Sequence, residues 1–127
     1  MNERTETRRI AVLVGSLRAQ SFNARLADTL GKRVPAHVEW QRLALHDLPL
    51  YNQDLDADMP EPVQRLKREI AAADGVVFVT PEYNRSIPGV LKNAIDHASR
   101  PYGHSAWAGK PAGVLDRKST RLNSSHG

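Results

Sequence analysis

The sequence predicts an α/β protein, with an open parallel sheet that carries helices on both faces. Three observations predict it. Short, continuously apolar segments end at loops containing glycine or proline, as is typical of parallel strands buried on both faces. Segments with helical apolar spacing alternate with them, and this strand–helix order indicates right-handed crossovers. The length of 127 residues suits one domain.

The first strand and the first helix are predicted between residues 9 and 31. Ile10–Val14 is apolar throughout and ends at Gly15, which indicates a buried strand followed by a tight turn. Ser21 can cap the helix that follows. Apolar residues then recur at helical spacing until a glycine ends the helix: Phe22, Leu26, Leu30 and Gly31.

The middle of the chain predicts a second strand, a long surface loop and a second helix. Residues 37–45 alternate enough between apolar and polar to indicate a strand, and residues 46–59 are rich in Asp and Pro. Pro60 and Pro62 are placed where a helix starts. The apolar positions of that helix keep a regular spacing that faces one core: Val63, Leu66, Ile70 and Ala73.

The last predicted elements are a third strand, a third helix and a fourth strand. Gly75–Thr80 is a buried strand, and a polar loop follows it from 82 to 87. Pro88 is placed for the first turn of a helix that ends before Pro101. Pro111–Leu115 begins the fourth strand. A complete sheet of this class would continue, so we expect a domain that lacks its C-terminal strand and helices.

Composition and charge exclude several function classes. The chain has no cysteine, which excludes disulfides and thiolate metal sites. No apolar run is long enough for a membrane span and the N-terminus is polar, so we expect a cytoplasmic protein with no membrane partner. The formal net charge is +4, but residues 116–127 alone carry three basic side chains and one acidic one. We therefore expect no nucleic-acid partner.

The sequence divides into three regions. Residues 1–7 are polar and predict a disordered N-terminus, and residues 8–115 carry the strand–helix pattern. Residues 116–127 are polar and aperiodic, and they closely resemble the conceptual translation of a sequencing-adapter oligonucleotide. We predict that 116–127 is a non-native tail; the alternative is a natural disordered tail.

The loop after the first strand has the composition of a phosphate site. Backbone N–H groups at a helix start are unsatisfied and carry partial positive charge, to which Ser16, Ser21 and Asn23 add donors and Arg18 adds charge. The loop contains neither G-x-G-x-x-G nor G-x-x-x-x-G-K-[ST], so a terminal monophosphate fits better than a dinucleotide or a triphosphate. The alternative is a capped helix with an incidental surface arginine.

A second polar loop, Pro81–Gly89, leaves the carboxyl end of the third strand and so faces the same crevice. Tyr83 offers an aromatic surface, and Asn84 offers both a donor and an acceptor. Backbone N–H groups can bond the carbonyl oxygens of a planar ring such as an isoalloxazine. The alternative is a turn whose polar residues are only solvated.

Together, residues 15–23 and 81–96 resemble the NADPH-dependent FMN reductase family, whose members include quinone, chromate and azo reductases. The resemblance covers residues 8–115 and implies a flavodoxin-like, three-layer fold with strand order 2-1-3-4(-5) and FMN as cofactor. The implied contacts to the phosphate and ribityl end are Ser16, Arg18, Ser21, Phe22 and Asn23. Those bordering the isoalloxazine are Pro81, Glu82, Tyr83 and Asn84.

The resemblance implies an enzyme that takes electrons from NADPH or NADH and passes them to a small-molecule acceptor such as a quinone. Because the flavin carries the chemistry, we predict no catalytic side chain and no metal. It also implies a homodimer or homotetramer in the full-length parent, and a helix-structural role for Lys92, Asn93 and Asp96. The chain departs from the family at His97, where an aromatic residue is usual. The family's third cofactor loop is replaced by 116–127.

Two alternatives to the enzyme remain. The first is a flavodoxin-like electron carrier, although such carriers are usually acidic and residues 1–115 are mildly basic. The second is a non-functional fragment that cannot hold its fold.

Asp54–Asp58 imitates the opening of a calcium loop, but Met59 stands where that motif needs glycine and Arg65 where it needs glutamate.

Overall fold

The computed structural model follows the predicted alternation of strands and helices. It describes residues 7–15, 22–80, 89–100, 105–107, 109–116 and 122–126. The elements in chain order are β1 (Arg8–Val14), α1 (Phe22–Gly31), β2 (Val38–Arg42), the short 3-10 helix η1 (Gln53–Asp56), α2 (Glu61–Ala72), β3 (Gly75–Thr80), α3 (Gly89–Ser99), β4 (Pro111–Asp116) and β5 (Leu122–His126).

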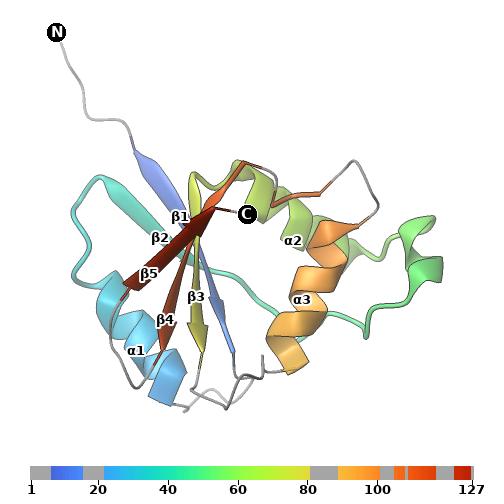
Figure 1. Ribbon diagram of the computed structural model, residues 1–127, viewed down its shortest axis with the longest axis horizontal. Helices are drawn as coiled ribbons and strands as arrows, with labels where there is room; N and C mark the ends of the chain where they lie inside the picture. The colour runs from blue at the N-terminus through green and yellow to red at the C-terminus, as the bar shows by residue number, and fades with distance from the viewer. Residues whose placement is uncertain are drawn as a thin grey trace, which may run out of the picture.

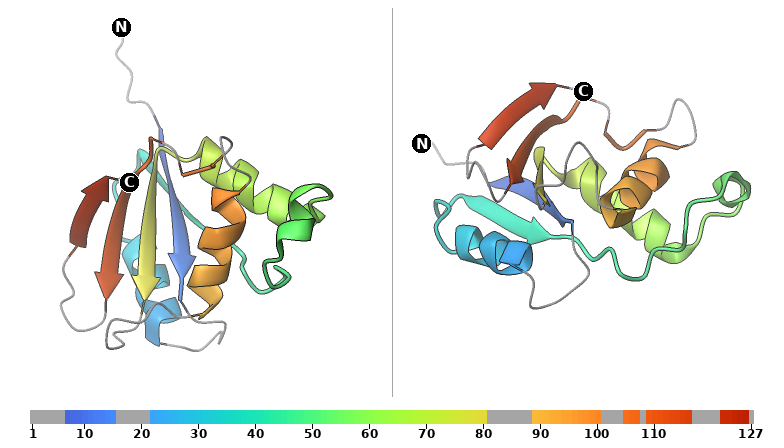
Figure 2. Two further views of the ribbon diagram at one scale, coloured as in Figure 1. Left: turned by 45° about the vertical axis from the view of Figure 1, so that its right-hand side comes forward. Right: turned by 60° about the horizontal axis from the view of Figure 1, so that its bottom comes forward.

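The middle layer is a five-stranded sheet in the order β2-β1-β3-β4-β5. Its first four strands are parallel: Ile10 of β1 lies opposite Trp40 of β2 and Gly75 of β3, and Val77 of β3 lies opposite Gly113 of β4. Figures 1 and 2 show α1 on one face of the sheet and α2 with α3 on the other. The predicted three-layer architecture and the strand order 2-1-3-4 are confirmed.

Residues 122–126, within the predicted tail, form a strand that was not predicted. β5 pairs antiparallel with β4, so that Leu122 lies opposite Leu115, and Asp116 is the last residue of β4. The polar, aperiodic composition of 116–127 gave no strand signal. A ladder between strands is made by backbone N–H and C=O groups, so an edge strand can form without an apolar pattern.

The second strand is shorter than the predicted span of 37–45. β2 ends at Arg42, although the amide of Leu43 still donates to the Val12 carbonyl at 2.9 Å. Leu43 and Leu45 are then buried in the core beside α2 and α3. The alternation read as a strand therefore continues past the end of β2 in residues that pack in the core, and the predicted loop 46–59 contains η1.

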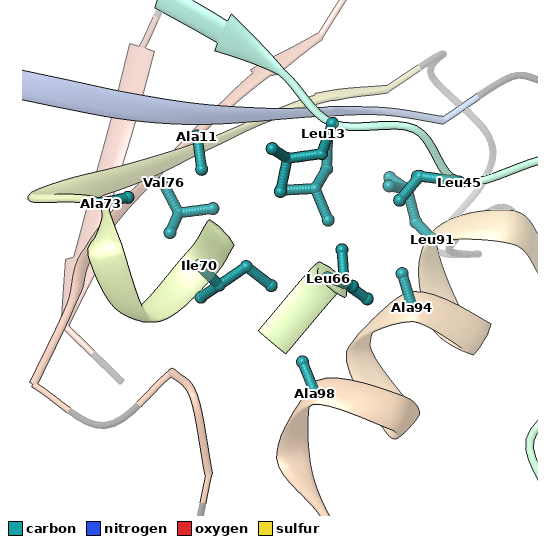
Figure 3. Packing of buried hydrophobic residues seen from close by; sticks show 11 residues of the cluster. Ala11, Leu13, Leu45, Leu66, Ile70, Ala73, Val76, Leu91, Ala94 and Ala98 are labelled. Atoms are coloured by element: carbon teal, nitrogen blue, oxygen red, sulfur yellow. The ribbon is translucent and has the colours of Figure 1, made fainter. Parts of the chain in front are cut away.

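The two faces of β1 supply two apolar clusters. Val12 and Val14 pack with Ala27 of α1, whereas Ala11 and Leu13 face the other side. Figure 3 shows that second cluster between the sheet and two helices, with these helical members: Leu66, Ile70, Leu91, Ala94 and Ala98. Burial on both faces explains why this strand reads as a continuous apolar run.

α1 is fixed on its face of the sheet by a tryptophan. The indole Nε1 of Trp40 donates to the Ala27 carbonyl at 2.9 Å. A Cβ atom added at Gly31 would come within 2.5 Å of the Trp40 ring, so the helix end needs a residue without a side chain there. The glycine that marks the predicted end of this helix therefore also makes room for the indole.

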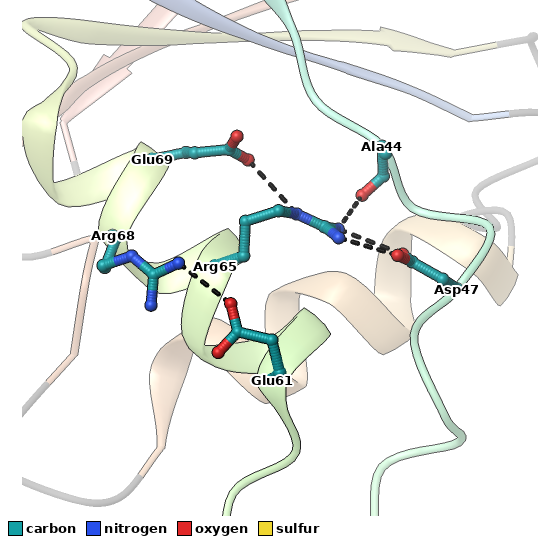
Figure 4. Close-up of polar contacts among 6 residues, drawn as sticks. All are labelled: Ala44, Asp47, Glu61, Arg65, Arg68 and Glu69. Carbon is teal, nitrogen blue, oxygen red and sulfur yellow. Dashed lines mark hydrogen bonds and ion pairs between the residues drawn. The ribbon is translucent and has the colours of Figure 1, made fainter.

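A polar clamp holds the chain after β2 against α2. Arg65 donates to both carboxylate oxygens of Asp47, at 2.7 and 3.0 Å, and to the Ala44 carbonyl at 2.9 Å (Figure 4). Glu69, one helical turn further on, places a carboxylate oxygen 3.7 Å from Arg65 Nε. The hydrogen bond from Arg65 lowers the pKa of Asp47 below its ordinary value. Residues 44–47 are thus anchored where the chain heads toward α3.

Truncation of the central core should be costly. Leu66→Ala truncates a fully buried side chain of α2 that shares a core cluster with residues of β1 and α3. We expect it to lower the free energy of unfolding by about 2–5 kcal/mol. Urea unfolding followed by circular dichroism measures this. The matched control is Leu50→Ala, because Leu50 is 83% exposed and should change stability by about 0.5 kcal/mol or less. Equal losses in the two variants would contradict the described core.

The Arg65 clamp should give stability a particular pH dependence. The folded pKa of Asp47 lies below its ordinary value of 3.8, so the pair stabilises the fold above that pH and loses its effect as pH falls through the folded pKa. Asp47→Asn should cost about 1 kcal/mol or less at neutral pH, because water screens this partly exposed pair. Urea unfolding at several pH values should show the difference shrinking in acid. A difference that does not vary with pH would refute the clamp.

Candidate functional site

Two adjacent strands, β1 and β3, end side by side at one edge of the sheet. Val14 lies opposite Val79, and the Gly15 amide donates to the Val79 carbonyl at 2.7 Å. The chain therefore leaves the sheet at neighbouring positions after Gly15 and after Thr80. Figure 1 shows α1 and α3 starting near this edge, one on each face. Open α/β sheets bind ligands outside the carboxyl ends of their strands, so this edge is the candidate site.

Asn23, the second residue of α1, is the predicted site residue whose side chain the structure describes. It is 5% exposed, and its Oδ1 atom has no hydrogen-bond partner among the described residues. A buried amide without a partner costs about 1–3 kcal/mol, so a partner at this position would stabilise the fold. An amide can donate to a phosphate oxygen and accept from a ribityl hydroxyl. Asn23 therefore fits the phosphate and ribityl end of FMN.

The other predicted contacts are described by their backbone alone or lie outside the described residues. Phe22 begins α1, and only its backbone is described. Seven of the predicted contacts lie outside the described residues: Ser16, Arg18, Ser21, Pro81, Glu82, Tyr83 and Asn84. The structure describes the strands and helices from which these two loops depart, and the assignment of the loop residues stays a prediction.

α3 is tied to the chain after β2 by a contact that the sequence did not predict. Asn93 donates from Nδ2 to the Pro49 carbonyl at 2.9 Å and accepts from the Tyr51 amide at 2.7 Å. Nε2 of His97 lies 2.7 Å from the same Pro49 carbonyl, and the His97 ring meets the Tyr51 ring edge-on with centroids 5.2 Å apart. We name these four residues the α3 clasp.

The clasp revises two expectations drawn from the sequence. Asn93 was assigned to helix structure alone, yet it bonds to chain more than forty positions away. His97 is 2% exposed, so its departure from the family pattern is accommodated by packing and a hydrogen bond. Lys92 and Asp96 do form an ion pair on the exposed face of α3, at 3.2 Å. The sequence signal that could have indicated the clasp is the pair Asn93 and His97, which lie one helical turn apart beside the apolar positions of α3.

A second polar cluster lies at the C-terminal end of α3. The Tyr51 hydroxyl donates to Asp56 at 3.2 Å, Arg100 pairs with the same carboxylate at 3.3 Å, and Lys67 donates to the Arg100 carbonyl. Burial lowers the pKa of Lys67. A pocket of about 330 Å³ beside this cluster is lined by Tyr51, Gln53, Asp96, Ser99 and Arg100. Its α3 residues belong to the half of the helix remote from the motif edge, so it is separate from the candidate site.

The described part of the chain shows neither a metal-binding cluster nor a membrane-spanning helix. There, no group of three or more His, Cys, Asp or Glu side chains is arranged to hold a metal ion. Within the same residues, no helix has the length and apolar character needed to cross a bilayer.

Curated proteins of similar sequence are named as quinone reductases. The 2-hydroxy-1,4-benzoquinone reductase of Burkholderia sp is 53% identical over 107 residues, which make up 84% of this chain and 58% of that protein. The quinone reductase of Escherichia coli strain K12 is 47% identical over 110 residues, with the same two coverages. This chain spans about 58% of the length of these relatives.

A solved structure shares the fold. FerB, described as a flavoenzyme NAD(P)H:(acceptor) oxidoreductase from Paracoccus denitrificans, matches with a TM-score of 0.81 and 52% identity, over 87% of this chain and 60% of that one. This likeness confirms the flavodoxin-like fold. The family model for NADPH-dependent FMN reductase matches residues 8–126, a span that contains every described strand and helix. The chain belongs to the NADPH-dependent FMN reductase family.

Proposed function

We propose that this protein is an FMN-dependent oxidoreductase that passes electrons from NADPH or NADH to quinones or similar small acceptors. One observation carries the proposal. The two sequence motifs of the family flank strands that end side by side, with Val14 opposite Val79. A ligand at this edge can therefore meet residues 16–23 at one end and residues 81–84 at the other.

In this proposal the two ends of the cofactor are held differently. Ser16, Arg18, Ser21, Phe22 and Asn23 would hold the phosphate and ribityl end, and Pro81, Glu82, Tyr83 and Asn84 would border the ring. The start of α1 contributes partial positive charge, and the buried amide of Asn23 contributes a donor and an acceptor. The proposal is supported by the fit of these groups to a monophosphate that carries neighbouring hydroxyls.

The protein's part in the reaction is to bind and orient. When bound, FMN supplies the hydride and electron transfer chemistry between the nicotinamide and the acceptor. Side chains at the crevice need to hold the phosphate, fix the plane of the ring and leave one face open to both substrates in turn. No acid or base is assigned, because the flavin itself carries the chemistry.

The first test follows the flavin spectrum of the protein loaded with FMN. We expect the absorbance to bleach on addition of NADPH and to recover on addition of a quinone, and steady NADPH oxidation should need no partner protein. A carrier of the flavodoxin kind would instead need a separate protein to reduce it. Flavin that stays oxidised with both NADPH and NADH would refute the proposed activity.

The second test concerns the phosphate end of the site. Arg18→Ala should weaken FMN binding by about 1.5–3 kcal/mol if the guanidinium donates charged hydrogen bonds to the phosphate. Fluorescence titration of FMN measures the affinity. Arg25→Ala is the matched control, because Arg25 is an exposed arginine of the same helix region and should leave the affinity unchanged. Equal FMN affinity of the two variants would support the alternative interpretation, in which the loop only caps a helix and Arg18 is an incidental surface arginine.

A further inference from the structure

On the face of α3 that packs in the core, two of the three buried apolar side chains are alanines. Its fully or nearly fully buried apolar residues are Leu91, Ala94 and Ala98. Alanine buries little area and has no long side chain to interlock with the facing ridge, so this packing alone defines the rotation of the helix weakly. The Trp107 indole donates to the Ile95 carbonyl at 3.3 Å, which fixes only the C-terminal half. In the half next to the candidate site, Leu91 is the large buried apolar side chain.

The α3 clasp supplies directional contacts on a different side of the helix. Through one planar amide, Asn93 bonds to the carbonyl of Pro49 and to the N–H of Tyr51, the residues on either side of Leu50. Two bonds to one amide fix orientation as well as distance. A carbonyl can only accept, so His97 donates from Nε2. His97 is buried, and water cannot readily replace that bond.

The segment that the clasp grips is itself fixed. Leu43 and Leu45 are buried in the core, and Asp47 is held by Arg65 of α2. The Leu43 amide extends the ladder to β1. The clasp therefore connects α3, through residues 43–51, to β1 and α2 at the centre of the domain.

We infer that Asn93 and His97 are positioning residues of the flavin site. They hold the middle and the C-terminal half of α3, whose first turn begins at Gly89 directly after the loop proposed to border the ring. They act through the helix, and they take no part in the chemistry. The inference rests on the proposed function for the identity of the site, but the placement of α3 can be measured without any cofactor.

The experiment compares four variants of the full chain. Asn93→Ala and His97→Leu remove clasp donors, while His97→Gln keeps an amide donor near the position of Nε2. Lys92→Ala is the control, since it breaks only an exposed ion pair on the same helix. Amide hydrogen exchange is measured in the chain without cofactor. Exchange of the hydrogen-bonded amides of α3, from Asn93 onward, should rise about tenfold in the first two variants, with α1 unchanged.

The second readout is the bound flavin. For Asn93→Ala and His97→Leu we expect the Kd for FMN to rise about tenfold and the visible circular dichroism of the flavin to change. His97→Gln and Lys92→Ala should match the unaltered chain. Thermal unfolding, measured in parallel, shows whether each variant is folded at the temperature of the titration.

Each outcome decides the inference. A folded Asn93→Ala variant with unchanged α3 exchange, Kd and flavin dichroism would overturn it, and so would faster exchange spread evenly over all elements. If Asn93→Ala does not fold, the two His97 variants decide: rescue by Gln supports the inference, and equal loss in Gln and Leu overturns it. Failure of the unaltered chain to bind FMN would refute the proposed function here, while hydrogen exchange would still test the clasp.

Discussion

The pairing of β1 with β3 is the constraint on which the rest of the structure depends. Each strand is buried on both faces, so its register decides which side chains meet α1 and which meet α2 and α3. A slip of one residue would exchange the two faces and expose Leu13 and Val12 to the wrong partners. The same register brings Val14 opposite Val79, so the chain leaves these two strands at neighbouring positions. One ladder therefore determines both the core and the candidate site.

Polar contacts refine the orientation of elements that this ladder and its apolar clusters define only loosely. Trp40 fixes α1, Arg65 fixes the chain after β2, and Asn93 fixes α3. A typical net hydrogen bond contributes only about 1 kcal/mol, far less than the burial of a core leucine. Their importance lies in direction: each bond requires one orientation of an element that hydrophobic packing alone would allow to rotate or slide.

The sequence predicted the elements because their signals are local. The apolar run Ile10–Val14 and the spacing of Val63, Leu66 and Ile70 follow directly from the periods of strands and helices. The end of β2 was wrong because Leu43 and Leu45 keep the same alternation while packing against helices. β5 was missed because the ladder that holds it is made by the backbone.

Contacts between distant positions could not be predicted in the same way. Asn93 and Pro49 are separated by 44 positions, and no period connects them. Asn93 and His97 show only that a helix carries polar groups beside its apolar stripe, a pattern equally typical of solvated residues. Asn23 is different, because its position shortly after a strand and a glycine turn predicted that it lies at the start of a helix, and it is the second residue of α1.

Among the residues that the structure describes, the two usual indicators of a functional site lie away from the candidate edge. Shifted pKa values often mark active sites, yet Asp47, Arg65 and Lys67 lie in contacts that anchor α2 and α3 to their neighbours. The described pocket also belongs to that region. FMN, when bound in the proposed site, would supply the reactivity, and such a site needs accurately placed donors. In such a protein, the contacts that hold a helix at the correct angle matter as much to function as the residues that touch the ligand.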